Sequence, residues 1–389
     1  MKWSVIKRKL ARVDKALDKS IDEAQTPGAV VLARMPREEE VIEHLSIRGH
    51  AVVRPERIPM TRDTIFDLAS LTKPLATTTA LMLLVEEGAV ALDDPVAKVL
   101  PSFADRGKEE VSFRQLLTHS SGLKPWRAFH ELLIQKERKT GERFMGTPEG
   151  REWIIDRVLR SALVHEPGQA AVYGDLDFIV LGVAVEALTK QPLDVFCEER
   201  VFGPLGMKDT RFFPLPPDGA EGHSSVPPAL RRRVAATENC PWRDRILWGE
   251  VHDPNASAMG GVAGHAGLFS TADDIMRFAR VFLDVWHGRS DLLPREQVLR
   301  FSERQRLPED SDWAIGWDTP TTGQSSSGKH FSERSVGHLG FTGTSLWIDL
   351  EREAVVVMLT NRVHLVAKRS RFDLRPTVHD HILDAFQAG

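Results

Sequence analysis

The stretch that decides the fold reads Phe66-Asp67-Leu68-Ala69-Ser70-Leu71-Thr72-Lys73. It is followed by Pro74 and by the apolar run of residues 75–85. Proline fits into an α-helix only in the first turn, where its missing N–H breaks no hydrogen bond, so a helix must begin near Ser70. On that helix Lys73 lies one turn from Ser70 on the same face, and its amine can reach the Ser70 hydroxyl.

This pairing has a chemical and a structural interpretation. A helix N-terminus offers free N–H groups and a positive potential, which favour an alkoxide or an oxyanion, so the pair predicts a serine nucleophile with a lysine partner. The alternative is an N-capping serine with a solvated lysine. Three further Ser-x-x-Lys matches lie in a charged helix or in loops and predict no such site: Ser4/Lys7, Ser121/Lys124 and Ser326/Lys329.

Tyr173 is the only tyrosine among 389 residues, which include 18 Phe and 9 Trp. It stands just ahead of an apolar helical stretch, and His338-Leu339-Gly340 follows far downstream. A lone tyrosine is often a half-buried ring whose hydroxyl bonds a backbone carbonyl. Serine, lysine, tyrosine and a basic residue before a glycine, in this order, instead predict a serine acyl-transfer enzyme.

Composition excludes several classes of function. The hydrophobic content of 42% and charged content of 27% are ordinary for a globular protein, and a net charge of −4 gives no reason to expect a nucleic-acid partner. No stretch approaches 18 uninterrupted apolar residues, so no membrane span is expected. The charged first 25 residues lack the apolar core of a signal peptide, which predicts a cytoplasmic protein. Cys197 and Cys240 are expected to be free thiols.

Other reaction classes find no support. The segment that begins with His130 and Glu131 starts like a zinc-binding helix but lacks the second histidine. The sequence contains no G-x-S-x-G elbow, Walker A motif or G-x-G-x-x-G run, so neither a metal nor a nucleotide cofactor is expected. His119, Ser120 and Ser121 are expected in a turn that closes a helix, because Gly122 follows them.

Apolar patterns predict strands at both ends of the chain and helices between them. Strands are expected at residues 29–33, 43–53, 344–349 and 354–360, and helices at 6–21, 75–87, 113–117, 150–159, 176–189, 193–201, 272–286 and 377–388. This order predicts an α+β fold in a single domain of residues 1–389. Its α/β lobe would comprise about residues 1–70 and 330–389, and its helical lobe about 71–329, with the active site in the cleft between them.

Several motifs in one order resemble the serine β-lactamase and penicillin-binding protein superfamily. They are the stretch around Ser70 and the segments 93–96, 116–123, 202–207 and 264–270. The likeness is to the class C-type branch, which also holds D-alanyl-D-alanine carboxypeptidases, D-aminopeptidases and family VIII carboxylesterases, and it runs from about residue 25 to the C-terminus. The resemblance implies a β-lactamase/transpeptidase-like fold, with an antiparallel sheet flanked by helices.

The resemblance also implies roles for residues. Ser70 would be the acylated nucleophile, Lys73 its partner base and Tyr173 the first residue of the family's Tyr-x-Asn motif. His338-Leu339-Gly340 takes the place of the family's Lys-Thr-Gly, and the backbone N–H groups of Ser70 and Phe341 would form the oxyanion hole. Tyr173, lowered in pKa by Lys73, would take the Ser70 proton and pass it to the leaving group. Which of Lys73 and Tyr173 is the base in each step stays open.

Two departures from the family pattern bear on the substrate. Asp175 replaces the asparagine, and its carboxylate would hold Lys73 protonated and repel a negative substrate. His338 is mostly neutral near pH 7 and Leu339 has no hydroxyl, so the usual clamp for a substrate carboxylate is weakened. Arg362 is a candidate substitute anchor for an anion. Further substrate contacts are expected from Gly340 and His252.

Three functional hypotheses follow. The first is a serine hydrolase that forms an acyl-enzyme and acts on an ester, a D-amino-acid peptide or a muropeptide-like amide. The second is a true β-lactamase or penicillin-binding D,D-carboxypeptidase, against which the His-Leu-Gly motif counts. The third is a catalytically silent penicillin-recognition fold used for binding, against which the intact Ser70, Lys73 and Tyr173 count.

Overall fold

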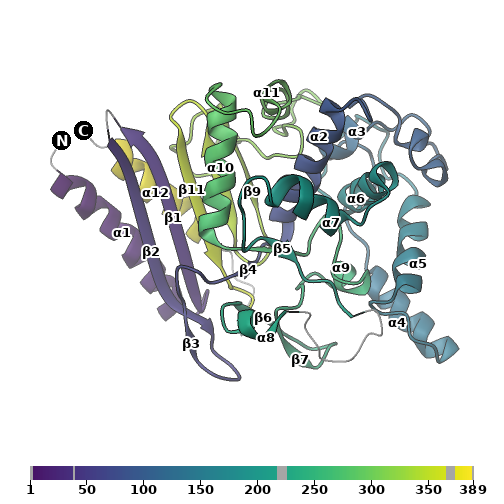
Figure 1. Cartoon of the computed structure of the whole chain (residues 1–389), viewed down its shortest axis with the longest axis horizontal. Helices are drawn as coiled ribbons and strands as arrows, with labels where there is room; N and C mark the ends of the chain where they lie inside the picture. Colours follow the sequence, from purple (N-terminus) through teal and green to yellow (C-terminus); the bar gives the residue numbers. More distant parts are fainter. Residues whose placement is uncertain (1–2, 38–39, 217–225, 365–372, 388–389) are drawn as a thin grey trace.

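A six-stranded antiparallel sheet joins the two ends of the chain. Figure 1 shows the computed structural model, which describes residues 3–37, 40–216, 226–364 and 373–387. The strand order is β3-β2-β1-β11-β10-β9. The strands are β1 (Gly28–Arg37), β2 (Glu40–Val52), β3 (Ile58–Pro59), β9 (Ser335–Leu339), β10 (Ser345–Asp349) and β11 (Ala354–Thr360). The expected antiparallel sheet built from both chain ends is confirmed.

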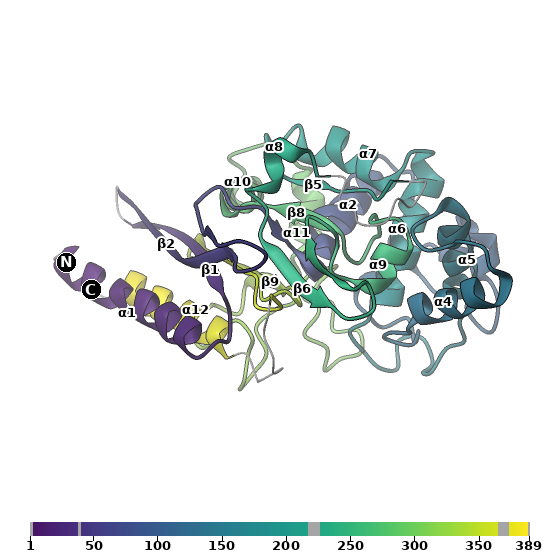
Figure 2. The same cartoon turned by 90° about the horizontal axis from the view of Figure 1, so that it is seen from below.

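The central strands β1 and β11 are covered on both faces, which explains their continuous apolar sequences. Alternate side chains of β1 point to opposite faces, so Val31 packs with α1 (Trp3–Asp22) and α12 (Leu374–Gln387) while Val30 faces the main core. Figures 1 and 2 show α1 and α12 side by side on one face. The other face is covered by α10 (Ala272–Trp286).

The remaining helices lie beyond α10, with α4 and α5 at the end of the molecule opposite α1 (Figures 1 and 2). These helices are α2 (Thr79–Glu86), α3 (Phe113–Leu117), α4 (Phe129–Thr140), α5 (Pro148–Leu159), α6 (Asp175–Thr189), α7 (Leu193–Cys197), α8 (Pro228–Arg231), α9 (Pro254–Ala258) and α11 (Arg295–Phe301). A small sheet joins β4 (Phe66–Asp67), β8 (Leu268–Ser270) and β5 (Arg211–Phe212), and β6 (Ala236–Cys240) pairs with β7 (Arg245–Trp248).

The helix that follows Ser70 is less regular than the sequence indicates. A 3₁₀ turn covers Ala69–Leu71, wide π-helical turns cover Lys73–Thr78, and α2 begins only at Thr79. The Thr79 hydroxyl donates to the Pro74 carbonyl at 2.9 Å, so a side chain satisfies an acceptor within this irregular stretch. Such π-helical turns are frequent at functional sites.

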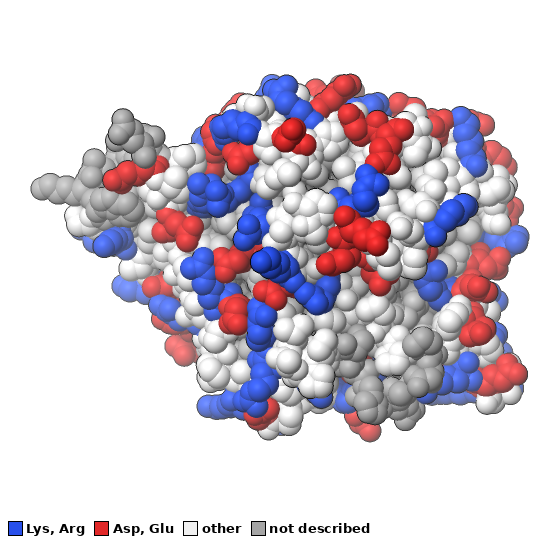
Figure 3. Space-filling model, in the orientation of Figure 1, with Lys and Arg blue, Asp and Glu red and all other residues white. Residues whose placement is uncertain are grey.

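Several other expectations can be compared with the described residues. Both cysteines are free and buried, as expected. No helix among the described residues is long and apolar enough to cross a membrane. The α4 helix was not expected. The stretch 214–228 is rich in proline and glycine, which predicts a surface loop, and its residues 217–225 lie outside the described residues. Basic and acidic side chains are intermingled over the face shown in Figure 3.

Candidate active site

Ser70 follows a strained turn that a buried carboxyl group holds in place. Ala69 adopts a left-handed conformation with φ of 48°, which is unfavourable for a residue with a β-carbon. The Asp67 carboxyl accepts hydrogen bonds from the Ala69 N–H at 2.8 Å and from the His252 N–H at 2.7 Å. Burial raises the pKa of Asp67 to about 6. Asp67 therefore fixes the backbone immediately before the proposed nucleophile.

Lys73 is fully buried next to Ser70 and makes polar contacts with three other parts of the chain besides Tyr173. Its Nζ lies 3.1 Å from Ser70 Oγ, 2.7 Å from Asp175 Oδ1 and 3.2 Å from the carbonyl oxygen of His265. Burial is the largest single influence and would lower the pKa of Lys73, but the charges of Asp175 and Tyr173, with the hydrogen bonds to both, together outweigh it, and the pKa is raised above its ordinary value. Lys73 is thus held as an ammonium, which agrees with the expectation for a carboxylate at position 175.

Tyr173 stands over the Lys73 ammonium, with its ring centroid 4.9 Å from Nζ. Although 40% of the residue is exposed, burial around its hydroxyl raises the pKa of Tyr173. The charge of Lys73 and hydrogen bonds to Lys73 and Ser70 lower that pKa only in part. The expectation of a lowered Tyr173 pKa is wrong in its net direction, because sequence does not show how far a hydroxyl is removed from water.

His119 supports Tyr173, a contact that the sequence did not reveal. The expected turn after α3 is present, and in it the His119 ring lies 4.8 Å from the Tyr173 ring. His119 Nδ1 accepts a hydrogen bond from the Gly174 N–H at 3.3 Å and lies 3.2 Å from Asp177 Oδ2. Burial raises the pKa of Asp177 to about 8, so its carboxyl is largely neutral near pH 7.

A cavity of about 430 Å³ opens beside Ser70 and Tyr173. It is also lined by Trp313, Asp318, Ser326, His338, Leu339, Gly340, Phe341, Arg362 and Arg375. The structure thus brings most of the predicted site residues to one place. Lys73 contacts Ser70 directly, and Asp175 contacts Lys73. His252 lies to one side, where its ring stacks on Phe341 at 5.4 Å and its Nε2 lies 3.6 Å from Glu238.

The strand that ends in Gly340 is pressed against the Ser70 turn. A β-carbon at Gly340 would lie 2.4 Å from the Leu68 carbonyl oxygen, so only glycine allows this approach. The Thr344 hydroxyl donates to the same carbonyl at 3.1 Å. This close contact places Phe341, the other predicted oxyanion donor, next to the serine turn.

His338 carries no charge at this site. Its Nδ1 donates to the Leu339 carbonyl at 2.8 Å. Burial and the nearby Lys73 hold the pKa of His338 well below its ordinary value. The expectation that His338 cannot replace a lysine as a cationic anchor is consistent with this environment.

Two arginines supply positive charge to the cavity instead. Arg362 was expected from sequence, whereas Arg375, at the start of α12, was not. The Arg375 guanidinium donates to the Gly340 carbonyl. Burial, with the charge of Arg362, lowers the pKa of Arg375 to about 9, which still leaves it charged at neutral pH. On the same wall, burial raises the pKa of Asp318 to about 7.

Three side chains that can bind a metal gather next to Lys73. The ligand atoms of Asp175, Asp253 and His265 lie within 4.8 Å of one another. His265 Nε2 lies 2.8 Å from Asp253 Oδ1, and although burial opposes it, His265 holds the pKa of Asp253 well below its ordinary value. The Lys73 ammonium already contacts the Asp175 carboxylate and the His265 carbonyl. In the structure, two residues of this cluster therefore bind the Lys73 ammonium, which is a cation of the chain itself.

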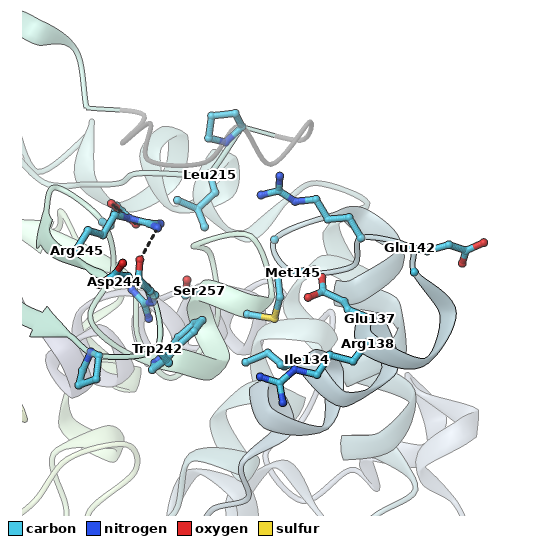
Figure 4. Close-up of a pocket in the computed structure, with 17 residues that line it drawn as sticks. Ile134, Glu137, Arg138, Glu142, Met145, Leu215, Trp242, Asp244, Arg245 and Ser257 are labelled. Carbon is cyan, nitrogen blue, oxygen red and sulfur yellow. Dashed lines mark hydrogen bonds and ion pairs between the residues drawn. The ribbon is translucent and has the colours of Figure 1, made fainter.

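A larger cavity of about 990 Å³ lies between α4 and the β6–β7 turn. Figure 4 shows Leu215, Met145 and Trp242 around it. Its lining contains no serine–lysine pair, so its size alone does not make it the reaction site. Arg243 in its lining donates to the carbonyls of Val251 and His252.

Comparisons with known proteins agree with this fold. The family model described as "Beta-lactamase" matches residues 13–376. A putative D-alanyl-D-alanine carboxypeptidase of Escherichia coli (strain K12) is 34% identical over 345 residues, covering 81% of this chain and 73% of that protein. The structure of EstCE1, a hydrolase with promiscuous acyltransferase activity, has a TM-score of 0.71 at 22% identity, covering 97% of this chain and 99% of that one.

A penicillin-binding protein homologue from Pyrococcus abyssi is also similar in structure. Its TM-score is 0.68 at 21% identity, and the match covers 97% of this chain and 77% of that one. The expected fold class and the resemblance stated from the sequence motifs are both confirmed.

Proposed function

Since the chain belongs to the β-lactamase family of serine hydrolases, we propose that it hydrolyses peptides of D-amino acids that end in a free carboxylate. The observation that carries this proposal is the position of Ser70, in contact with Lys73, in a cavity that also contains Arg362 and Arg375. Guanidinium groups bind carboxylates through paired hydrogen bonds. The E. coli relative, named as a putative D-alanyl-D-alanine carboxypeptidase, supports the same substrate class.

The chemistry would proceed by acyl transfer to Ser70. Ser70 Oγ attacks the peptide carbonyl, and the developing oxyanion is held by the backbone N–H groups of Ser70 and Phe341. The Ser70 proton is transferred to the leaving amine by way of Tyr173 and Lys73 as the peptide C–N bond breaks, which leaves the acyl group as an ester on Ser70. Water then hydrolyses this ester and frees the enzyme. In the resting site Lys73 is an ammonium and Tyr173 keeps its proton, because both pKa values are raised. Neither group can then accept the Ser70 proton, so the reactive form of the enzyme has lost one proton from Lys73 or Tyr173.

The arginines change the order of preference reached from sequence alone. The loss of the family's lysine at position 338 counted against β-lactams and peptides with a free C-terminal carboxylate, relative to other esters and amides, because no cation was expected on that strand. Arg375 now adds a buried guanidinium beside Gly340, and Arg362 lines the same cavity. A substrate carboxylate bound there would be near the scissile bond without any charge on His338. Ester hydrolysis is the second candidate, favoured by Trp313 and by Phe341, which is 52% exposed.

The test compares one peptide ending in two D-alanines with the same peptide carrying a C-terminal amide. The wild-type enzyme should cleave the acid with at least about tenfold higher kcat/KM, the value of a hydrogen bond to a charged group. Arg362→Gln should remove most of that preference, whereas Arg232→Gln, which alters an exposed arginine paired with Glu56, should keep it. Equal cleavage of acid and amide by the wild-type enzyme would contradict the proposed substrate class.

A second arm tests the nucleophile separately. Ser70→Ala should lower the turnover of peptides and of a p-nitrophenyl ester by about a thousandfold or more, and intact-mass spectrometry should find no acyl adduct. Retention of either activity would show that Ser70 is not the nucleophile. If the wild-type protein turns over neither substrate, the result would support the third hypothesis, a catalytically silent fold used for binding.

A further inference from the structure

A basic cavity lies next to the segment that carries Tyr173 and Asp175. Its volume is about 660 Å³, and its lining includes Leu176, the residue after Asp175. The Asp175 N–H donates to the carbonyl of Pro125, and the residue before that proline, Lys124, also lines the cavity. The charged lining consists of one carboxylate, Asp156, and five basic side chains: Arg106, Lys124, Arg127, Arg157 and Arg160.

These basic residues come from three separate parts of the chain. Arg106 follows the 3₁₀ turn at Pro101–Phe103, Lys124 and Arg127 lie between α3 and α4, and the other two lie at the C-terminal end of α5. Folding therefore brings together cations that are distant in the sequence. The remaining lining includes the apolar residues Ala162, Leu163 and Val164.

The positive charges around this cavity are only partly balanced by neighbouring acids. Asp156 is 2.6 Å from Arg160 and 3.9 Å from Arg157, so one carboxylate serves two guanidiniums. Arg106 is 3.6 Å from Asp105. Among the described residues, neither Lys124 nor Arg127 forms an ion pair, and the Arg127 guanidinium lies over the Phe129 ring. Like charges gathered in this way create a positive local potential that favours the binding of an anion.

We propose that this basic cavity binds a small compound with more than one negative charge, of the phosphate or diphosphate class. Planar guanidiniums match the oxygens of a phosphate group, and several of them together favour a multiply charged anion over a single carboxylate. The volume is within the usual range of ligand sites, about 300–1,000 Å³. The site is separate from the cavity beside Ser70, and no lining residue is common to the two.

Titration calorimetry with inorganic pyrophosphate at fixed ionic strength tests this proposal. The wild-type protein should bind one equivalent saturably, and the double variant Lys124→Gln/Arg127→Gln should bind on the order of tenfold more weakly. The matched control Lys15→Gln/Arg57→Gln removes the same net charge from exposed positions elsewhere and should bind as the wild type does.

Three results would overturn the proposal. They are the absence of saturable binding by the wild-type protein, equal affinity of the Lys124→Gln/Arg127→Gln variant, and an equal loss in the control variant, which would indicate a general effect of net charge. Turnover of a p-nitrophenyl ester by both variants checks that each is folded. Substitution of exposed side chains outside the Ser70 cavity should leave that turnover unchanged.

Discussion

Replacing Asp175 by asparagine removes the charge that holds Lys73 as an ammonium and leaves an oxygen that can still accept its hydrogen bond. In the wild-type site the raised pKa of Lys73 favours the protonated form, so the reactive form with one proton fewer accumulates only at high pH. Without the charge of Asp175, Tyr173 is the main remaining influence that opposes burial, and burial lowers the pKa of Lys73. The pH dependence of the reaction should therefore move to lower pH.

The size of the effect follows from the geometry. Lys73 Nζ and Asp175 Oδ1 are 2.7 Å apart, and their side chains are 0% and 19% exposed, so solvent screens them little. At this separation two unit charges attract by about 6 kcal/mol for an effective dielectric constant of about 20. Part of this attraction offsets the desolvation of the pair. We expect the midpoint of the pH profile to move down by about 1–3 pH units, the usual effect of a close opposite charge.

The assay is kcat/KM for a neutral p-nitrophenyl ester between about pH 6 and 10.5, corrected for spontaneous hydrolysis. Asp273→Asn is the matched control, because it removes a carboxylate from an exposed ion pair with Arg62. Its profile should coincide with that of the wild type. Because the Lys73 pKa of the wild type lies above its ordinary value of 10.5, the wild-type rate should still rise at the upper end of this range, and the effect is read as the displacement of the Asp175→Asn profile to lower pH. An Asp175→Asn profile that coincides with the wild-type profile would refute the reasoning, since the ionisation of Lys73 would then not control the reactive form.

Two further predictions concern the cavity wall and the packing of α6. Because burial raises the pKa of Asp318 to about 7, its carboxyl group becomes negative above that pH and then repels the carboxylate of a substrate. KM for a peptide with a free carboxylate should therefore rise between about pH 6 and 8.5 in the wild type and stay level in Asp318→Asn. A β-carbon at Gly264 would lie 2.1 Å from the Phe178 carbonyl oxygen, so Gly264→Ala should lower the free energy of unfolding in urea by about 1–3 kcal/mol; an unchanged value would contradict this packing argument.

Much of the fold could be predicted from local patterns. The bounds of α10 and β11 match the expected ranges, because one has a clear helical period and the other a run of apolar residues typical of a strand buried on both faces. The α4 helix escaped notice because much of its surface is polar and Phe129 and Leu133 alone among its apolar residues are fully buried. The π-helical turns after Ser70 have the same apolar pattern as an α-helix, so periodicity could not distinguish them.

The candidate site was predictable where a motif identifies a residue and unpredictable where folding alone creates a contact. The contact between Lys73 and Asp175 follows from chemistry that the sequence displays. Arg375 and His119 reach the site from distant parts of the chain, and no spacing rule connects them to Ser70. Burial determines the net direction of the Tyr173 pKa, and burial is a property of the whole fold. The lobe boundaries, the cytoplasmic location and the catalytic roles stay predictions.

The two departures from the family motifs are connected through Lys73. Its charge contributes to the low pKa of His338, so the two side chains are within electrostatic range of each other. A lysine at position 338 would place a second ammonium near Lys73, which Asp175 keeps charged. A neutral histidine avoids that repulsion, so Asp175 and His338 belong together as one arrangement of charge.

A double-mutant cycle tests this connection. His338→Lys alone should destabilise the protein, because two ammoniums then repel each other in a buried site. In the presence of Asp175→Asn, Lys73 can lose its proton, and the same substitution should cost less. We expect an interaction energy of about 1–3 kcal/mol from urea unfolding of the wild type, both single variants and the double variant. Free energies that add within about 0.5 kcal/mol would show that the two positions are independent. The relocation of positive charge to Arg362 and Arg375 would then need another cause than the ammonium of Lys73.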